Sequence, residues 1–355
     1  MNHLRRRAVW VACAALVAAA ATAAVHASSP VRGHAAADYV WKLPPGFPVP
    51  SVPSNNAMSP AKVELGRRLF FDPRLSITGQ YSCASCHDPA RAFSDGRARA
   101  IGASGARLRR NAPTLVNVAY ASSLGWEQRN LRSLERQMLI PLFNDRPIEL
   151  GLRGRERTIE LLLARDAELA AAFAAAFPHS DNSSQPVSIA NAVRAIAAFE
   201  RTVIYGDSPF DHYVFRGEHS ALSDAAKRGM AWFFSARSGC SNCHSGLNLA
   251  GPWVDASTPR ARAAFASNDG SGREFRIPTL RNVTVTAPYM HDGRYGTLDV
   301  VVDHYLRAGH RKNRDPRIRL LTMSLHQRAD LLAFLNSLTD SRFAVQIKTA
   351  KLASD

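Results

Sequence analysis

Two short motifs constrain this chain more than any other feature of its sequence. Residues 83–87 read CASCH and residues 240–244 read CSNCH, so both have the spacing C-x-x-C-H. In this pattern two thiols bond covalently to a porphyrin, and the histidine that follows ligates the iron. The sequence therefore predicts two covalently bound c-type haems, with the attachment residues Cys83, Cys86 and His87 for the first and Cys240, Cys243 and His244 for the second.

The number of cysteines agrees with this assignment. The chain has five, and the fifth, Cys13, lies in an N-terminal segment that we expect to be removed. No cysteine then remains for a disulfide in the oxidising compartment that this segment implies. A zinc site is a weaker alternative, because its ligands must meet in one place whereas the two motifs lie in different halves of the chain.

The first 27 residues have the pattern of a secretory signal peptide. Three arginines at positions 5–7 precede the apolar run AVWVACAALVAAAATAA, and Val25 and Ala27 provide a cleavage site. A membrane anchor is the alternative, which the short, alanine-rich run disfavours. We therefore expect cleavage after Ala27, export to the periplasm, and a mature chain without a membrane span.

Composition and charge narrow the possible partners. The chain is 46% hydrophobic and 21% charged, which is typical of a soluble globular protein. Its formal net charge of +16 falls to +13 without residues 1–27, because these hold three arginines and no acidic residue. The propionates of two haems would lower it to about +9. A basic surface suits an acidic protein partner, and nucleic acid is a poor partner for an exported protein.

The sequence around the two motifs is repeated. Helix starts at Ser59 and Ser223 each lead to a Phe-Phe pair before the motif, and PTLVNV (113–118) and PTLRNV (278–283) follow it. Beyond these strings, Trp126 matches His291, and Leu134 matches Leu298. Such ordered matches indicate an internal duplication of a helical unit that wraps one haem.

The remaining segments are also mostly helical. Apolar residues recur with helical spacing in 157–177, 188–204 and 326–338, and few stretches alternate as strands do. We expect a mainly α protein of two cytochrome c-like helical domains, 28–205 and 206–355, with one haem each. The tail from about residue 310 to 355 is free to pack on the first domain.

The repeat distinguishes the two haems on the face opposite each histidine. Seven residues after Leu298 stands Tyr305, whose phenolate can ligate iron, whereas seven residues after Leu134 stands Pro141, which has no donor atom. This predicts a closed second haem, suited to electron transfer, and an open first haem that can react with peroxide. The alternative ligands for the second haem are Met290, His304 and His310.

Peroxide chemistry at an open haem requires an acid or base that moves a proton between the two oxygens. Three acids lie near Pro141 in the sequence: Glu135, Asp145 and Glu149. Glu149 stands between two apolar residues shortly after a proline, as a partly buried acid does. The residues alone leave all three open.

These residues together resemble the bacterial di-haem cytochrome c peroxidase superfamily, in particular its MauG type and the methanobactin-associated di-haem enzymes. The resemblance covers nearly the whole mature chain. The strings that carry it for the superfamily are LGRRLFFDPRLS (65–76), CASCHDPARAFSDG (83–96), RNAPTLVNVAY (110–120), CSNCH and PTLRNVTVTAPYMHDG (278–293). Those that resemble the methanobactin-associated enzymes are WKLPPGFPVPSVPSNNAMSPAKVELGRR (41–68) and LIPLFNDRPIELGL (139–152).

The resemblance implies roles for single residues. The haem on His87 would react with peroxide in the N-terminal, peroxidatic domain, and the haem on His244 would serve electron transfer. At the first haem, Glu149 matches the family's acid-base residue, although it lies two residues farther from the glutamine than in the commoner peroxidases. The other positions implied are Gln137 and Pro141 in the distal pocket, Trp126 between the haems, and Asn111 with the carbonyls of Thr286 and Pro288 as calcium ligands.

Two departures from ordinary peroxidases are MauG-like. Tyr305 stands where they have a methionine ligand, and Ala103 stands where many have a histidine that blocks the first haem. The resemblance therefore implies an enzyme that uses hydrogen peroxide to reach a high-valent di-haem state. That state would oxidise a Trp or Tyr of a periplasmic partner protein by long-range electron transfer.

Two alternatives remain from the sequence. The first is a cytochrome c peroxidase that reduces peroxide to water with electrons from a small cytochrome or cupredoxin. The second is a non-enzymatic electron carrier, which requires both irons to be six-coordinate.

Overall fold

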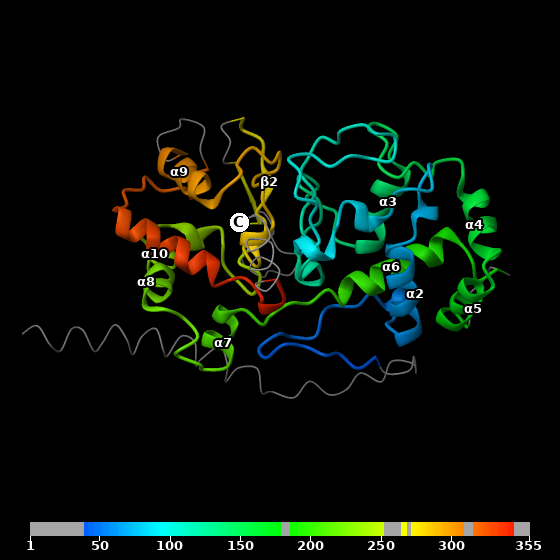
Figure 1. Cartoon of the computed structure of the whole chain (residues 1–355), viewed down its shortest axis with the longest axis horizontal. Helices are drawn as coiled ribbons and strands as arrows, with labels where there is room; N and C mark the ends of the chain where they lie inside the picture. The colour runs from blue at the N-terminus through cyan, green and yellow to red at the C-terminus, as the bar shows by residue number, and fades with distance from the viewer. Residues whose placement is uncertain (1–38, 179–184, 252–263, 268–270, 309–314, 344–355) are drawn as a thin grey trace, which may run out of the picture. The chain divides into compact units, whose positions relative to one another are not determined.

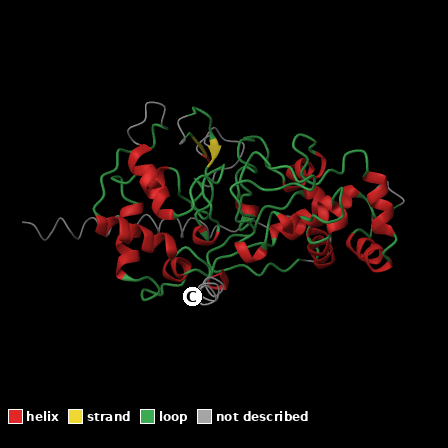
Figure 2. Cartoon of the chain, turned by 45° about the horizontal axis from the view of Figure 1, so that its top comes forward, coloured by secondary structure: helices red, strands yellow, loops and turns green. Residues whose placement is uncertain are grey.

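The computed structural model describes residues 39–178, 185–251, 264–267, 271–308 and 315–343. Helices joined by long loops make up nearly all of it (Figure 2). None of the helices described is long and apolar enough to cross a membrane. The predicted signal peptide and the alternative ligand His310 lie outside the described residues.

Five α-helices are described in the first half (Figure 1). Their bounds are α2 Pro60–Phe70, α3 Leu134–Phe143, α4 Glu156–Ala164, α5 Ala167–Ala176 and α6 Ile189–Arg201. The hydroxyl of Ser59 caps α2 by accepting from Lys62 N. The helical segment expected over 157–177 is divided in two, because the side chain of Asp166 accepts from Leu169 N and begins a new helix.

Four helices and one small sheet form the second half. The helices are α7 Pro209–Phe215, α8 Asp224–Phe233, α9 Leu298–Ala308 and α10 Leu325–Asn336. The strands β1 Phe265–Ala266 and β2 Phe275–Arg276 pair antiparallel. Both haem motifs begin in 3₁₀ turns, Cys83–Ser85 and Cys240–Asn242.

The duplication predicted from the sequence is confirmed in the helix crossings. α2 packs on α6, and α8 packs on α10 in the same way. A Cβ added to Gly66 would lie 1.9 Å from the carbonyl oxygen of Ala195, and one added to Gly229 would lie 1.9 Å from that of Asp330. Only glycine therefore permits either crossing.

The loops after the motifs repeat as well. Asn117 and Asn282 both have left-handed backbones, with φ of 57° and 59°. Asn117 N donates to Val203 O at 2.8 Å, and Asn282 N donates to Leu338 O at 2.9 Å. Each asparagine thus fixes its loop to the end of a helix, α6 in one half and α10 in the other.

The buried apolar side chains form two separate clusters. One draws on residues between 65 and 203 and also on Phe343, while the other draws on residues between 210 and 338. Phe343 stacks on Tyr205 with ring centroids 4.9 Å apart, so the described end of the chain packs against the first cluster. The domain limits 28–205 and 206–355 stay a prediction.

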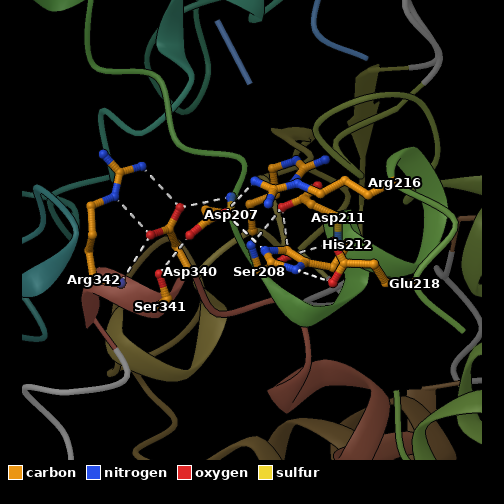
Figure 3. Close-up of polar contacts among 10 residues, drawn as sticks. Asp207, Ser208, Asp211, His212, Arg216, Glu218, Asp340, Ser341 and Arg342 are labelled. Carbon is orange, nitrogen blue, oxygen red and sulfur yellow. Dashed lines mark hydrogen bonds and ion pairs between the residues drawn. The ribbon is translucent and has the colours of Figure 1, made fainter. Parts of the chain in front are cut away.

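A polar network joins the start of α7 to the chain's C-terminal segment (Figure 3). Asp207 Oδ1 accepts from His212 Nε2 at 2.9 Å and from Arg216 at 2.6 Å. Asp207 N donates to Asp340 Oδ2 at 3.0 Å, and the Ser341 hydroxyl donates to Asp207 Oδ2 at 2.8 Å. The network fixes the connection between the two halves to the segment that follows α10.

Candidate haem sites

A cavity of about 220 Å³ lies beside the second motif. Cys240, Cys243 and His244 form part of its wall, and Tyr305 of α9 lines it too. Most of the other lining side chains are apolar, among them Phe233, Leu280, Val283, Val302, Leu331 and Leu335. Such a wall fits the flat apolar body of a porphyrin, with its attachment thiols and a histidine ligand in place.

Both motif histidines are oriented by a backbone carbonyl. Nδ1 of His87 lies 3.0 Å from Phe93 O, and Nδ1 of His244 lies 2.8 Å from Leu249 O. A hydrogen bond at Nδ1 fixes the tautomer and leaves Nε2 to ligate a metal. The arrangement is therefore that of an axial haem ligand in both halves.

The motif cysteines have the properties of thioether-forming thiols. All four are unpaired in the described structure. Burial raises the pKa of Cys86 to about 12 and that of Cys243 to about 11, so both remain protonated thiols at neutral pH. No group of three His, Cys, Asp or Glu residues in the described ranges is arranged to hold a metal ion. The residues present therefore fit haem attachment better than a zinc site.

The cavity separates the candidates for the second haem's sixth ligand. Tyr305 and Met290 both line it. His304 is buried elsewhere, with Nδ1 3.0 Å from the hydroxyl of Tyr295, and His310 is not described. Among the described residues the geometry therefore leaves Tyr305 and Met290 as candidates, His310 stays open, and the choice of Tyr305 stays a prediction.

The segment PIELG brings Glu149 to the first motif. Leu150 N, next to Glu149 in the chain, donates at 2.8 Å to the carbonyl oxygen of Pro141 in the last turn of α3. Ala103 N donates to Glu149 O at 2.6 Å. The pKa of Cys86 is raised mainly by burial, next by the charge of Asp95 and then by the charge of Glu149. The predicted first-haem positions Glu149, Pro141 and Ala103 thus lie together near the attachment residue Cys86.

Glu149 has the electrostatic environment of an acid-base residue. It is half-buried, and burial raises its pKa above the ordinary value of a glutamate, against a smaller lowering by a hydrogen bond with Asn144. A raised carboxyl pKa brings proton transfer closer to neutral pH. Gln137, also half-buried, precedes Pro141 by one turn on the same face of α3.

The two other candidate acids have different surroundings. Burial raises the pKa of Glu135, but hydrogen bonds, the first from Asn56, and the charge of Arg201 outweigh it and hold the pKa below its usual value. Asp145 is exposed and pairs with Arg153 at 3.6 Å. These contacts favour Glu149 over both.

Trp126 and the predicted calcium ligands line the cavity beside the second motif. Trp126 is 9% exposed, and its Nε1 donates to Asn111 O at 2.8 Å. Its ring meets that of His291 edge to face at 6.5 Å. Asn111, Thr286 and Pro288 line the same cavity. The wall brings the predicted positions together, and the calcium ion itself stays a prediction.

Arg276 is a cavity residue that the sequence reasoning missed. Its Nε donates to Gly125 O at 2.9 Å, and burial lowers its pKa to about 10. A guanidinium in this position suits a porphyrin propionate, which would supply the opposite charge. The available signal was an arginine inside the otherwise apolar string FRIPTL.

Known proteins match most of this chain. The family described as di-haem cytochrome c peroxidase matches residues 60–220. The methylamine utilization protein MauG of Methylorubrum extorquens is 33% identical over 92% of this chain and 91% of its own. The cytochrome c peroxidase IdrP1 of a Pseudomonas species is 34% identical over 84% of this chain and 86% of its own.

A solved structure matches the fold. It is that of a MauG-like protein associated with microbial copper homeostasis, with a TM-score of 0.80 and 38% identity over 86% of this chain and 97% of that one. The predicted architecture of two cytochrome c-like helical units is thereby confirmed.

Proposed function

We propose that this chain, which belongs to the di-haem cytochrome c peroxidase family, uses hydrogen peroxide to oxidise a Trp or Tyr side chain of a partner protein by long-range electron transfer. Family membership makes it a haem-dependent oxidoreductase of the peroxidase type with two haems and peroxide as its oxidant. It also removes the non-enzymatic electron carrier from consideration. The observation that carries the proposal is Tyr305 in the wall of the cavity beside the second motif.

At the first haem, three residues would serve two purposes. Glu149 would take a proton from one peroxide oxygen and return it to the other. Pro141 and Ala103 would offer no donor atom to the haem held by His87, which leaves room for peroxide. The two haems, when bound, supply the redox chemistry that accepts the two oxidising equivalents of one peroxide.

At the second haem, Tyr305 sets the reduction potential. An anionic phenolate stabilises oxidised iron more than a neutral thioether does, so it lowers the potential of the haem that it ligates. Such a haem accepts electrons poorly from a small cytochrome and holds an oxidising equivalent well. Trp126, on the wall of the same cavity, would carry electrons between the haems.

The setting of this reaction is also part of the proposal. The signal sequence supports a periplasmic enzyme, and the basic charge supports an acidic partner protein. Asn111 with the carbonyls of Thr286 and Pro288 would hold a calcium ion between the haems.

The experiment that tests the proposal is a mass analysis of partner proteins. Periplasmic extract is incubated with the di-haem enzyme and peroxide, and tryptic peptides are searched for oxygen addition at Trp and Tyr. We expect one protein to be modified in a time-dependent way, and not by a variant that carries Glu149→Gln. Peroxide consumption with no modified protein would contradict the proposal.

A second function is favoured by one observation. Met290 lines the same cavity as Tyr305, and a thioether ligand there would raise the potential enough to accept electrons from a small donor. The chain would then be a cytochrome c peroxidase. Steady-state peroxide reduction with reduced cytochrome c or a cupredoxin separates the two, because fast turnover is expected only with a thioether ligand.

A further inference from the structure

Glu200, near the end of α6, is a buried acid that the peroxide chemistry described above does not use. It is 5% exposed, and its Oε2 has no hydrogen-bond partner among the described residues. The next residue, Arg201, is also buried, yet it donates to Glu135 Oε1 at 2.7 Å. The nearest cation is thus shared with another carboxylate.

The internal repeat shows which wall Glu200 occupies. The pairs Gly66–Ala195 and Gly229–Asp330 place α6 and α10 in register, with equivalent residues 135 positions apart. Glu200 therefore corresponds to Leu335, which lines the cavity beside the second motif. By this equivalence the Glu200 side chain lies on the wall that faces the first haem.

An electrostatic contact supports this placement. Burial, and next the charge of Glu200, raise the pKa of the Cys83 thiol. Cys83 is the position at which the first porphyrin would be attached. The carboxyl group of Glu200 therefore lies within electrostatic range of the porphyrin edge.

The other charged groups near α6 do not neutralise Glu200. From α3 comes Glu135, whose charge raises the pKa of Glu200, while Arg201 lowers it. From α2 comes Lys62, whose ammonium donates to Asn56 Oδ1 at 3.2 Å and to a backbone carbonyl.

Two further groups lie at the margins of α6. Glu160 of α4 accepts from Ile189 N at the opposite end of the helix. The hydroxyl of Tyr120, beside the 3₁₀ turn that packs on α6, donates to Pro48 O. Burial outweighs the opposing charge of Arg201 and raises the pKa of Glu200 to about 8.

We propose that Glu200 exchanges a proton with solvent in step with the oxidation state of the first haem iron. When the iron gains one electron, the Glu200 carboxylate takes up one proton; when the iron loses one electron, the carboxylic acid releases one. The added positive charge of oxidised iron favours the carboxylate, and its loss favours the acid. Each step then leaves the net charge of the apolar first core nearly unchanged.

The proposal concerns how the first haem is tuned, and Glu200 acts through its charge without touching peroxide. It rests on haem attachment at Cys83 and Cys86. It does not depend on what the enzyme oxidises, so a failed search for a modified partner leaves it standing.

The test is a spectroelectrochemical titration of the di-haem protein at a series of pH values around the raised pKa. In the wild type, we expect the equilibrium constant for reduction of the first haem to fall by up to about tenfold per pH unit as pH rises through this range. Glu200→Gln should remove this pH dependence from the first haem and leave the reduction of the second haem unchanged. Glu200→Asp should restore it.

A matched control uses the repeat. Leu335→Glu places an acid at the equivalent position of the second haem and should give that haem a new pH dependence. The proposal is wrong if Glu200→Gln keeps the wild-type pH dependence of reduction, or weakens that pH dependence equally at both haems. Should the variant not fold, the wild type alone decides, because a pH indicator measures the protons taken up when the first haem is reduced. Reduction without proton uptake between about pH 7 and 9 would overturn the proposal.

Discussion

At the scale of single residues, three of the differences between the two halves of the repeat concern the predicted haem sites. Tyr305 of the second half corresponds to Pro141 of the first, Leu335 corresponds to Glu200, and Val301 corresponds to Gln137. In each pair the first half lacks the possible iron ligand or carries a polar side chain in place of an apolar one. If the proposals made above hold, one duplicated unit provides an open site that exchanges protons and a closed site in an apolar wall.

Glu149 gives the first residue-scale prediction. Glu149→Gln should slow the reaction of the di-haem enzyme with peroxide by about 10²- to 10⁴-fold. Because burial raises the pKa of Glu149, and the base form takes the first proton, the wild-type rate should rise with pH through that raised value. Stopped-flow spectra over a pH series measure both effects. Asp145→Asn, on the exposed neighbour, is the control and should change neither.

Tyr305 gives the second. Tyr305→Met should raise the reduction potential of the second haem and reduce partner oxidation at least about tenfold, because a thioether stabilises oxidised iron less than a phenolate does. Potentiometry and the resting electron-spin spectrum report the change of ligand. Tyr295→Phe, which removes a hydroxyl bonded to His304, should leave both as in the wild type. An unchanged spectrum in Tyr305→Phe would assign the ligand to one of the alternatives, of which Met290 lines the cavity and His310 lies outside the described residues.

At the scale of helices, the sequence predicted the elements well where capping and periodicity agree. α6 and α10 lie within or close to the expected 188–204 and 326–338, and Ser59 caps its helix as expected. The segment 157–177 was harder, because its composition is uniformly helical and only the side chain of Asp166 divides it.

The site was predictable to a different degree. Spacing alone identifies thiols and histidines, since the chemistry of attachment requires them in sequence order. Glu200 escaped because an acid near a helix end usually faces solvent, and only packing shows that this one is 5% exposed. The choice between Tyr305 and Met290 escaped for a related reason, because residues far apart in sequence meet in one cavity.

The helix crossings give a prediction at this scale. Gly66→Ala should lower the free energy of unfolding by about 1–3 kcal/mol, because the added Cβ would meet a rigid backbone carbonyl. Gly229→Ala should do the same in the second half. Gly296→Ala, where nothing lies within 4 Å, is the control. Urea unfolding measures all three, and a Gly66→Ala protein as stable as the wild type would contradict the crossing described here.

At the scale of the whole molecule, a polar network and the packing of Phe343 on Tyr205 both hold the connection between the two halves. Asp207 meets groups from α7 on one side and from the segment after α10 on the other (Figure 3). The two apolar clusters are separate, so this network contributes to how firmly the halves are joined. Because it contains a histidine between two carboxylates, its strength should depend on pH.

His212 is the titrating member of that network. Nδ1 lies 2.8 Å from Glu218 and Nε2 lies 2.9 Å from Asp207, and these two bonds raise the pKa of His212 above its ordinary 6.5. The raised pKa adds stability that is fully present below about pH 6.5 and is lost as pH rises through the folded-state value. His212→Gln should therefore destabilise the protein more near pH 5.5 than near pH 8.5, by about 1 kcal/mol or less because the side chain is partly exposed and solvent screens the charges. Urea unfolding at the two pH values measures the difference. The control Glu218→Gln should show a smaller difference between the two pH values. Equal destabilisation by His212→Gln at both pH values would mean that the histidine serves only as a neutral hydrogen-bonding group.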